Sequence, residues 1–288
     1  MGPSNYSRAL FAAAISLTSL AGAQTNVASI DVDDPRPVAA AIASLLERFP
    51  VVITYEDPRF EHSRDIKDVT DAVRNPLAPP STQRVLVPRG GSLQASYELS
   101  VSAGQPTDMG DALRRILAAN DAGPAGGRFR VLEAGGVFHV VPTAVRNAEG
   151  AWVTQASVLD TRISISVQGV NGFQLLDAIA TEIEDASGLR IGVAGEKFNN
   201  TLARYRGDME AVDELARDVL LPAVHGINER FTWRLFYGAG VKYYVLNLDV
   251  AAERAIEQPQ FVPPPPPRPG DPTPAFLSPN PSSTPAGP

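Results

Sequence analysis

The sequence predicts an α+β protein of two tandem small modules, each in the order strand–helix–strand–strand–helix–strand–strand. Stretches 29–142 and 162–249 both show that order, with runs rich in β-branched and aromatic residues separated by apolar stripes of helical period. The composition then changes after residue 257. We expect each module to form a small sheet of about three strands with two helices, plus a β-hairpin, around its own core.

The chain is expected to divide into five segments. They are a signal peptide at 1–23, a first module at 24–144 with an insertion at 58–82, a linker at 145–161, a second module at 162–257, and a tail at 258–288. Thirteen of the 26 prolines fall in residues 259–288. Such a segment buries too little apolar surface to offset its chain entropy, so we expect a disordered Pro-rich tail, either a spacer or a ligand for an aromatic groove.

The N-terminus has the three parts of an export signal. Arg8 supplies positive charge, 9–20 is an apolar stretch too short to cross a bilayer, and 21–23 fits the A-x-A pattern, with cleavage expected after Ala23. A buried N-terminal helix is the alternative for 9–20. No later stretch approaches roughly 20 apolar residues, so we expect no transmembrane segment after cleavage and a periplasmic or extracellular location.

The absence of cysteine and the acidic charge narrow the functional classes. Without cysteine, disulfides and a lipid anchor at the cleavage site are excluded, so an exported chain relies on its core. The net charge is −7 and the isoelectric point is about 5.1. A nucleic-acid partner requires a basic face, so we expect none.

The first module opens with a strand, a helix and a strand. Residues 29–32 alternate in polarity, and Asp33-Asp34-Pro35 supplies the capping chemistry of a helix start. The helix ends at Pro50, and its single apolar face consists of Val38, Ile42, Leu45, Leu46 and Phe49. Residues 51–55 are rich in β-branched and aromatic side chains, which predicts the next strand.

The rest of the first module is an insertion followed by a second half. In the insertion, 65–73 is expected to carry a short helix, and an added strand is expected directly after the insertion at 83–87. A helix capped by Thr107 or Asp108 and a hairpin turned at Gly135-Gly136 come next, since two glycines suit a tight turn. The strands of this half are expected at 95–101, 129–131 and 138–141.

The second module repeats the order. Asn171 is expected to cap a helix that ends at Gly188, and Asp208 to cap a later one. The inner face of that later helix is predicted as Val212, Leu215, Ala216 and Val219. Its strands are expected at 162–170, 189–193, 202–206, 231–237 and 241–249, with a short one at 152–153 in the linker.

Several residues carry a family likeness. They are Ile30-Asp31-Val32, Pro37-Val38, Ala41-Ile42, Leu99-Ser100-Val101, Gly104, Ala112-Leu113, Ile116-Leu117 and the Gly135-Gly136 hairpin. On these residues the first module resembles the short N-terminal (STN) domain shared by secretins and TonB-dependent receptors. Residues 162–248 are similar to the same module or to a related secretin N-domain. The resemblance implies a periplasmic domain that receives partner proteins or packs into rings, although the insertion departs from the pattern.

One cluster in the sequence has the residue types of a metal site. Glu61, His62 and Asp65 lie close in sequence and are weak candidates for metal ligands. The alternative is a solvated loop that starts a short helix with Asp65 as its cap. His139 is expected on the surface of a hairpin strand, and His225 beside the C-terminal end of the fourth helix, where a helix dipole favours it.

The remaining patterns point to an interaction protein. The sequence has no G-x-S-x-G elbow, and we expect no catalytic residue, no cofactor and no resident metal. We expect a non-enzymatic, exported protein–protein interaction module of the cell envelope, which binds an envelope protein or a receptor or secretion component by docking or by strand addition at a sheet edge. The alternative is an exported metal-binding protein or enzyme that uses the His62 loop.

Overall fold

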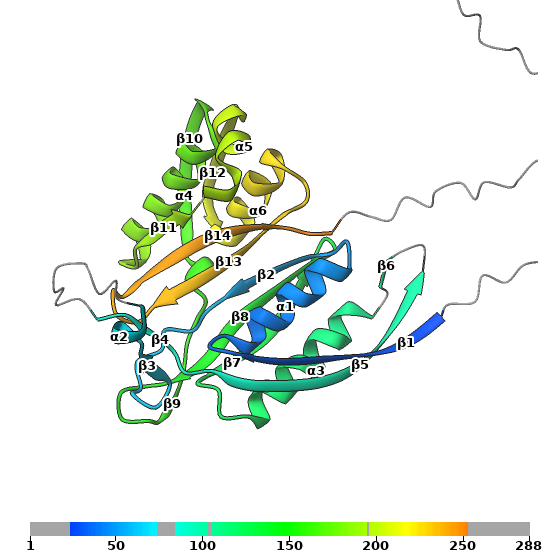
Figure 1. The fold of residues 1–288 in the computed structure, drawn as a ribbon. Coiled ribbons are helices and arrows are strands. Elements are labelled where there is room, and N and C mark those ends of the chain that lie inside the picture. The colour runs from blue at the N-terminus through cyan, green and yellow to red at the C-terminus, as the bar shows by residue number, and fades with distance from the viewer. Residues whose placement is uncertain (1–23, 74–83, 103–104, 107, 195, 253–288) are drawn as a thin grey trace, which may run out of the picture. The chain divides into compact units, whose positions relative to one another are not determined.

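The computed structural model has a mixed α+β fold, which confirms the predicted fold class (Figure 1). It describes residues 24–73, 84–102, 105–106, 108–194 and 196–252. The expected signal peptide at 1–23, the tail at 258–288 and residues 74–82 of the insertion lie outside the described residues. Within the described part of the chain, no helix has the length and apolar character needed to cross a membrane.

The first half of the chain contains eight strands and three helices among its described residues. In chain order they are β1 (Gln24–Asp34), α1 (Pro37–Arg48), β2 (Val52–Glu56), β3 (Ile66–Asp68), α2 (Thr70–Val73), β4 (Leu86–Pro88), β5 (Gly91–Ser102), β6 (Gln105–Pro106), α3 (Met109–Ala122), β7 (Gly127–Ala134) and β8 (Val137–Arg146). The insertion therefore carries β3, which pairs with β4 just beyond it, and the helix expected at 65–73 is confined to α2.

The second half follows through a short strand and a 3₁₀ turn. Its elements are β9 (Trp152–Thr154), η1 (Val158–Asp160), β10 (Arg162–Val170), α4 (Gly172–Ser187), β11 (Ile191–Ala194), η2 (Glu196–Phe198), α5 (Asn199–Arg204), β12 (Gly207–Leu215), α6 (Ala216–Ile227), β13 (Phe231–Gly238) and β14 (Tyr243–Val250). The short strand predicted at 152–153 is thus confirmed as β9.

Each half places two helices between two sets of strands. In the first half, β1 pairs with β5, while β2 pairs in parallel with β8 and β7 pairs antiparallel with β8. Helix α1 packs on β1 and β2, and α3 packs on β5 and β7. In the second half, β10 pairs with β12, β11 pairs in parallel with β14, and β13 pairs antiparallel with β14. Helix α4 packs on β10 and β11, and α6 packs on β12 and β13.

One sheet joins the two halves, contrary to the expectation of a separate sheet in each module. Strand β13 pairs in parallel with β2, with Arg234 opposite Tyr55 and Leu235 opposite Glu56. The combined order is β11-β14-β13-β2-β8-β7, with β9 beside β8. Residues 53–56 of β2 are all buried, because a strand inside a sheet is covered on both faces. The described residues 24–252 accordingly fall within one compact unit.

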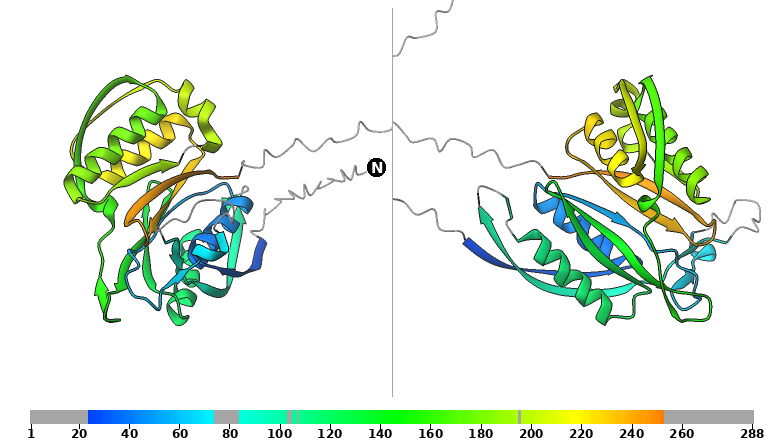
Figure 2. Two further views of the ribbon diagram at one scale, coloured as in Figure 1. Left: turned by 60° about the vertical axis from the view of Figure 1, so that its left-hand side comes forward. Right: turned by 180° about the vertical axis from the view of Figure 1, so that it is seen from behind.

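The sheet separates two hydrophobic cores. Leu235 belongs to the second-half core, whereas Phe236 packs against the first-half core. Neighbouring residues of a strand point to opposite faces, so the two cores lie on opposite faces of β13. The views in Figure 2 agree, with α4 and α6 on one side of the shared sheet and α1 and α3 on the other.

The region around β12 was predicted wrongly. Residues 202–206 were expected to form a strand, but α5 ends at Arg204. Asp208 was expected to cap a helix, but it lies at the start of β12. Its carboxylate accepts a hydrogen bond from the backbone N–H of Gly169 on β10. Val212 was expected on an inner helix face, but it lies on β12 and is 73% exposed. Helix α6 begins only at Ala216.

Several predicted helix ends and turns are confirmed. Asn171 caps α4 in a capping box with Gln174, and Gly188 ends the helix at a φ of 71°. Gly135 and Gly136 turn the β7–β8 hairpin with φ values of 57° and 80°. The start of α1 differs, because its N-cap is Arg36 rather than one of the residues 33–35.

Candidate functional site

A group of buried polar residues lies where β2 meets β13, and we call it the polar seam. It comprises Arg36, Tyr55, Glu56, Asp57, Ser157, Arg217 and Tyr237. Residues 55–57 end a hydrophobic strand with three polar side chains in succession. Because β2 is the interior strand at the join, these side chains enter the protein rather than the solvent.

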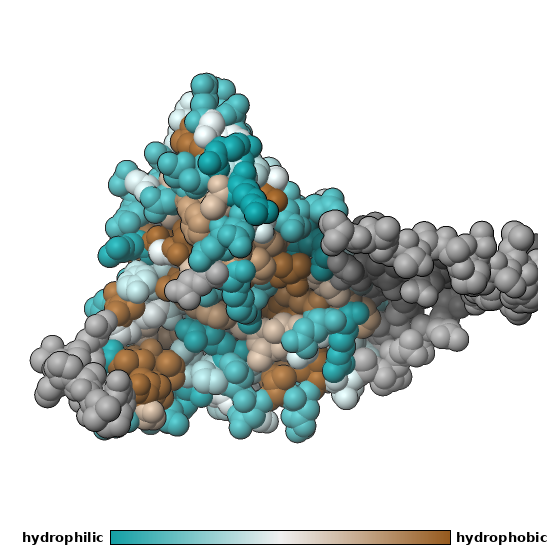
Figure 3. Space-filling model, turned by 45° about the horizontal axis from the view of Figure 1, so that its top comes forward, coloured by the Kyte–Doolittle hydropathy of each residue, from teal (hydrophilic) through white to brown (hydrophobic). Residues whose placement is uncertain are grey.

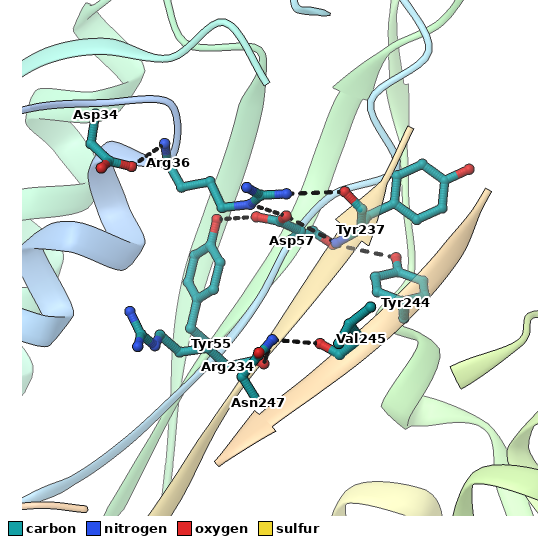
Figure 4. Close-up of polar contacts among 9 residues, drawn as sticks. All are labelled: Asp34, Arg36, Tyr55, Asp57, Arg234, Tyr237, Tyr244, Val245 and Asn247. Atoms are coloured by element: carbon teal, nitrogen blue, oxygen red, sulfur yellow. Dashed lines mark hydrogen bonds and ion pairs between the residues drawn. The ribbon is translucent and has the colours of Figure 1, made fainter. Parts of the chain in front are cut away.

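Asp57 is the centre of one end of the seam (Figure 4). Its carboxylate accepts hydrogen bonds from Arg36 Nε at 2.6 Å, from the Tyr55 hydroxyl at 2.7 Å and from the Tyr237 backbone N–H at 3.0 Å. Arg36 also donates to the Tyr237 carbonyl at 3.1 Å. The Tyr244 hydroxyl donates to the Asp57 carbonyl at 3.3 Å. The start of α1, the end of β2 and both strands of the β13–β14 hairpin therefore meet at one residue.

Burial controls the electrostatics at this end. Desolvation raises the pKa of Asp57, and the Arg36 guanidinium opposes that shift. Desolvation also raises the pKa of Tyr55 well above its usual value, with a further contribution from the nearby Asp57. The Arg36–Asp57 ion pair, whose carboxylate is fully buried, thus holds a charge in a low-dielectric environment.

Glu56 is the centre of the other end of the seam. It is 1% exposed, and it accepts hydrogen bonds from the Ser157 hydroxyl and, at 2.7 Å, from the Val158 backbone N–H. Arg217 of α6 donates to Ser157 Oγ at 3.1 Å and to Asp160 at 2.6 Å. Desolvation raises the pKa of Glu56 to about 7, although the hydrogen bonds from Ser157 and Val158 lower it. Strand β2 is in this way tied to η1 and α6.

Two further polar contacts cross or flank the join. The Thr232 hydroxyl of β13 donates to the Ile53 carbonyl of β2. Thr54 Oγ1 lies 2.8 Å from His139 Nδ1. His139 was expected at the surface, but it is 3% exposed, and burial lowers its pKa to about 4. The reason is that the face of β8 opposite its own core is covered, with the Trp233 ring 6.0 Å from His139.

The residues expected to form a linker contribute to this region. Gln155 is buried and accepts a hydrogen bond from the Arg59 backbone at 2.8 Å. Ser157 and Val158 bind Glu56, as described above. The stretch between the halves is therefore packed against both of them.

The three weak metal candidates have other surroundings. Asp65 is 3% exposed and forms a two-point ion pair with Arg146, at 2.7 Å and 3.1 Å. Glu61 is exposed, and His62 is half-buried with its ring close to Gly150. Within the described residues, no group of three or more His, Cys, Asp or Glu side chains is arranged to hold a metal ion. His225 lies in the last turn of α6, at the C-terminal end of that helix.

The side chains of the polar seam form contacts that connect the two halves of the protein. Ser157 and Glu56 have the residue types of a nucleophile and a base, but they are 4% and 1% exposed and bond within the seam. Sequence reasoning missed the seam, because its members are distant in the chain. The apolar run at 51–53 was the available signal, since a strand buried on both faces begins without polar alternation.

The comparisons with known proteins give no relative for this chain. No family model, no curated protein and no solved structure matches it.

Proposed function

We propose that the protein is a non-enzymatic, exported interaction protein of the cell envelope, built from two copies of one STN-like α+β module. The strand pairing supports the two-copy interpretation. The pair β1–β5 corresponds to β10–β12, and the three strands β2-β8-β7 correspond to β11-β14-β13, with the same parallel and antiparallel relations. Helices α1 and α3 correspond in the same way to α4 and α6.

The observation that carries the proposal is the fixed join between the halves. Asp57, Glu56 and Arg217 are engaged in holding β2 to β13, η1 and α6. The strands at the two ends of the shared sheet, β7 and β11, each have one neighbour among the described strands. A rigid unit that presents open strand edges is suited to binding a partner by strand addition.

The surface also fits docking to a protein. On the face shown in Figure 3, the described surface is mostly hydrophilic, with hydrophobic patches between polar residues. Among the residues that the structure describes, the exposed large hydrophobic side chains are Val73, Val85, Trp152, Val153, Val212 and Val241. The centre of the Trp152 ring lies 4.4 Å from the Arg128 guanidinium and 5.2 Å from the Arg146 guanidinium. Exposed aromatic and arginine side chains are typical of protein interfaces.

A pull-down from envelope extracts tests the proposal. The mature chain is immobilised and compared with Val193→Pro, which removes a backbone N–H from the edge of β11, and with Val193→Ala, which keeps that N–H. We expect the wild type and Val193→Ala to recover the same specific envelope protein, and Val193→Pro to lose it while its thermal melt stays cooperative. Recovery of no specific protein by the wild type would contradict the proposal.

Export is tested on the intact cell. We expect the periplasmic or secreted fraction to contain the protein with Gln24 as its first residue by N-terminal sequencing. An unprocessed protein confined to the cytosol would contradict export.

A further inference from the structure

The two end strands of the sheet, β11 and β7, correspond to the two strands that pair where the halves meet, which we call the internal join. At that join, β13 of the second half pairs with β2 of the first half. Under the correspondence of the halves, the counterpart of β13 is β7 and the counterpart of β2 is β11. The sheet order β11-β14-β13-β2-β8-β7 therefore ends in one strand of each kind.

We propose that a second copy of this chain extends the sheet by pairing its β7 with β11, in the manner of the internal join. The inference rests on the two-copy interpretation of the proposed function. It names the partner as another molecule of the same protein, and the binding surface as the β11 edge on one copy and the β7 edge on the other.

The strand directions allow a parallel contact. Strand β7 runs antiparallel to β8, which is parallel to β2, so β7 opposes β2. Strand β11 is parallel to β14, which opposes β13, and β13 is parallel to β2, so β11 also opposes β2. A copy placed at the β11 edge and rotated to follow the twist of the sheet thus brings β7 beside β11 in parallel. Such a head-to-tail contact leaves a free edge at each end, so it produces open chains of molecules.

The internal join also fixes the register. Val131 and Tyr55 both lie opposite Val140, as Leu235 and Val193 both lie opposite Leu246. The internal pair Arg234–Tyr55 therefore translates into Arg130 of one copy opposite Val193 of the next.

The backbone of β11 is oriented for this pairing. The Arg190 carbonyl accepts from Tyr244 N–H on β14, so residues 190, 192 and 194 direct their backbone groups to β14. Backbone groups alternate in direction along a strand. The N–H and carbonyl groups of Ile191 and Val193 consequently point away from β14, toward the proposed neighbour.

The charges of the two surfaces are complementary. On β7, Arg128 and Arg130 are exposed. Helix α4 packs on β11, carries Asp177, Glu182, Glu184 and Asp185, and has no basic residue. At the internal join, the start of the equivalent helix α1 reaches over β13, where the Arg36 guanidinium lies 4.6 Å from the Phe236 ring. The start of α4 would likewise reach over β7 of the next copy. Its acidic residues begin beyond the first turn, so α4 attracts Arg130 through the overall negative charge of the helix.

Disulfide trapping tests the proposal directly, because the chain has no cysteine of its own. The double variant Arg130→Cys/Val193→Cys places one thiol on each edge. Four strands separate β7 from β11 within one chain, which is too far for a disulfide. Under mild oxidation we expect a ladder of dimers, trimers and larger species on a non-reducing gel. Reduction should abolish the ladder, and mass spectrometry should map the bond to positions 130 and 193.

A matched control uses the same first thiol with a second one away from the edges. Val212 is 73% exposed on β12, so Arg130→Cys/Val212→Cys should give only background cross-linking. Sedimentation velocity of the wild-type mature chain supplies a second measurement, free of any variant. We expect its average mass to rise with concentration, and to rise less at high salt or in Arg130→Glu.

The proposal is overturned if the double variant cross-links no more than the control, or if the wild type sediments as a monomer up to millimolar concentration. That failure is distinct from failure of the proposed function. A monomeric protein that still recovers a specific envelope partner would refute self-association alone.

Discussion

Asp57 connects three parts of the chain through one buried carboxylate. It binds Arg36 ahead of α1, Tyr55 on β2 and the Tyr237 backbone on β13. The Arg36 side chain is 19% exposed and the Asp57 side chain is fully buried. Removing the Asp57 carboxylate alone should destabilise the fold strongly. The Arg36 charge and the buried donors would then remain without their acceptor.

The first prediction concerns this pair. We expect Asp57→Ala to lower the free energy of unfolding by about 3–5 kcal/mol, since Arg36 is left unpaired. The measurement is urea denaturation followed by circular dichroism. The matched control is Asp111→Ala, which removes an exposed ion pair with Arg114 and should change stability little. Equal effects of the two substitutions would show that the seam contributes no more than a surface pair.

The second prediction concerns the pH dependence of stability at Glu56. The folded pKa of about 7 lies above the ordinary value of 4.5. The stabilisation from its proton is therefore complete below about pH 4.5 and is lost as the pH rises through about 7. Glu56→Gln stays uncharged, so between about pH 4.5 and about pH 8 the wild type should lose about 3 kcal/mol relative to it. Denaturation at a series of pH values measures this difference.

The control for that series is Glu149→Gln, which removes an exposed carboxyl and should leave the wild-type curve unchanged. The comparison between variants is required because His139 acts in the opposite direction. Its pKa is lowered to about 4, so its neutral form makes stability rise with pH from about 4 to 6.5. Parallel curves for wild type and Glu56→Gln would contradict the account of Glu56.

At the scale of single elements, local chemistry decided which features the sequence could predict. The capping box at Asn171, the left-handed Gly188 and the Gly135-Gly136 turn each depend on residues within a few positions of one another. They were predicted correctly for that reason. The boundary between β12 and α6 depends instead on pairing with β10, and a positive φ at Asp213 interrupts the pattern. The helical spacing of Val212 and Leu215 was therefore misleading.

The third prediction tests the start of α4. The Asn171 side chain accepts from Gln174 N–H at 3.0 Å, and its own N–H donates to the Gln174 side chain at 3.0 Å. We expect Asn171→Ala to reduce stability by about 1 kcal/mol, because a helix N–H loses its acceptor. Asn171→Asp retains the acceptor and should stay close to wild type. Denaturation midpoints that do not separate the two variants would contradict the role of the cap.

The polar seam lay beyond sequence reasoning for a related physical reason. Glu56 meets Ser157 across 101 positions, and Asp57 meets Tyr237 across 180. No local pattern encodes such pairs. The metal-ligand candidates chosen from sequence proximity were Glu61, His62 and Asp65. They do not form a metal site among the described residues, because Asp65 forms an ion pair with Arg146. Proximity in the chain was a poor guide to proximity in space.

At the scale of the whole molecule, the shared sheet makes two cores into one structural unit. Many of the strands and helices could be placed from hydrophobic periodicity, although the strand expected at 202–206 was wrong. The pairing of β13 with β2 could not, because an edge strand and an interior strand of similar composition differ only in their neighbours. If the β2–β13 pairing couples the two halves, a substitution that destabilises one core must also lower the unfolding midpoint of the other. If it is weak, the halves unfold independently.

The most direct test of this account, and the fourth prediction, places the perturbation and the probe in different halves. Leu45 is fully buried in the first core, and Trp233 is buried in the second. In a Trp152→Phe background, Trp233 is the remaining tryptophan, and its fluorescence reports on the second core and on the face of the shared sheet where His139 lies. Leu45→Ala should cost about 2–5 kcal/mol, and we expect the urea midpoint reported by Trp233 to fall with it in a single transition. An unchanged Trp233 midpoint, with a separate earlier transition by circular dichroism, would contradict the continuous sheet as the element that unites the two halves.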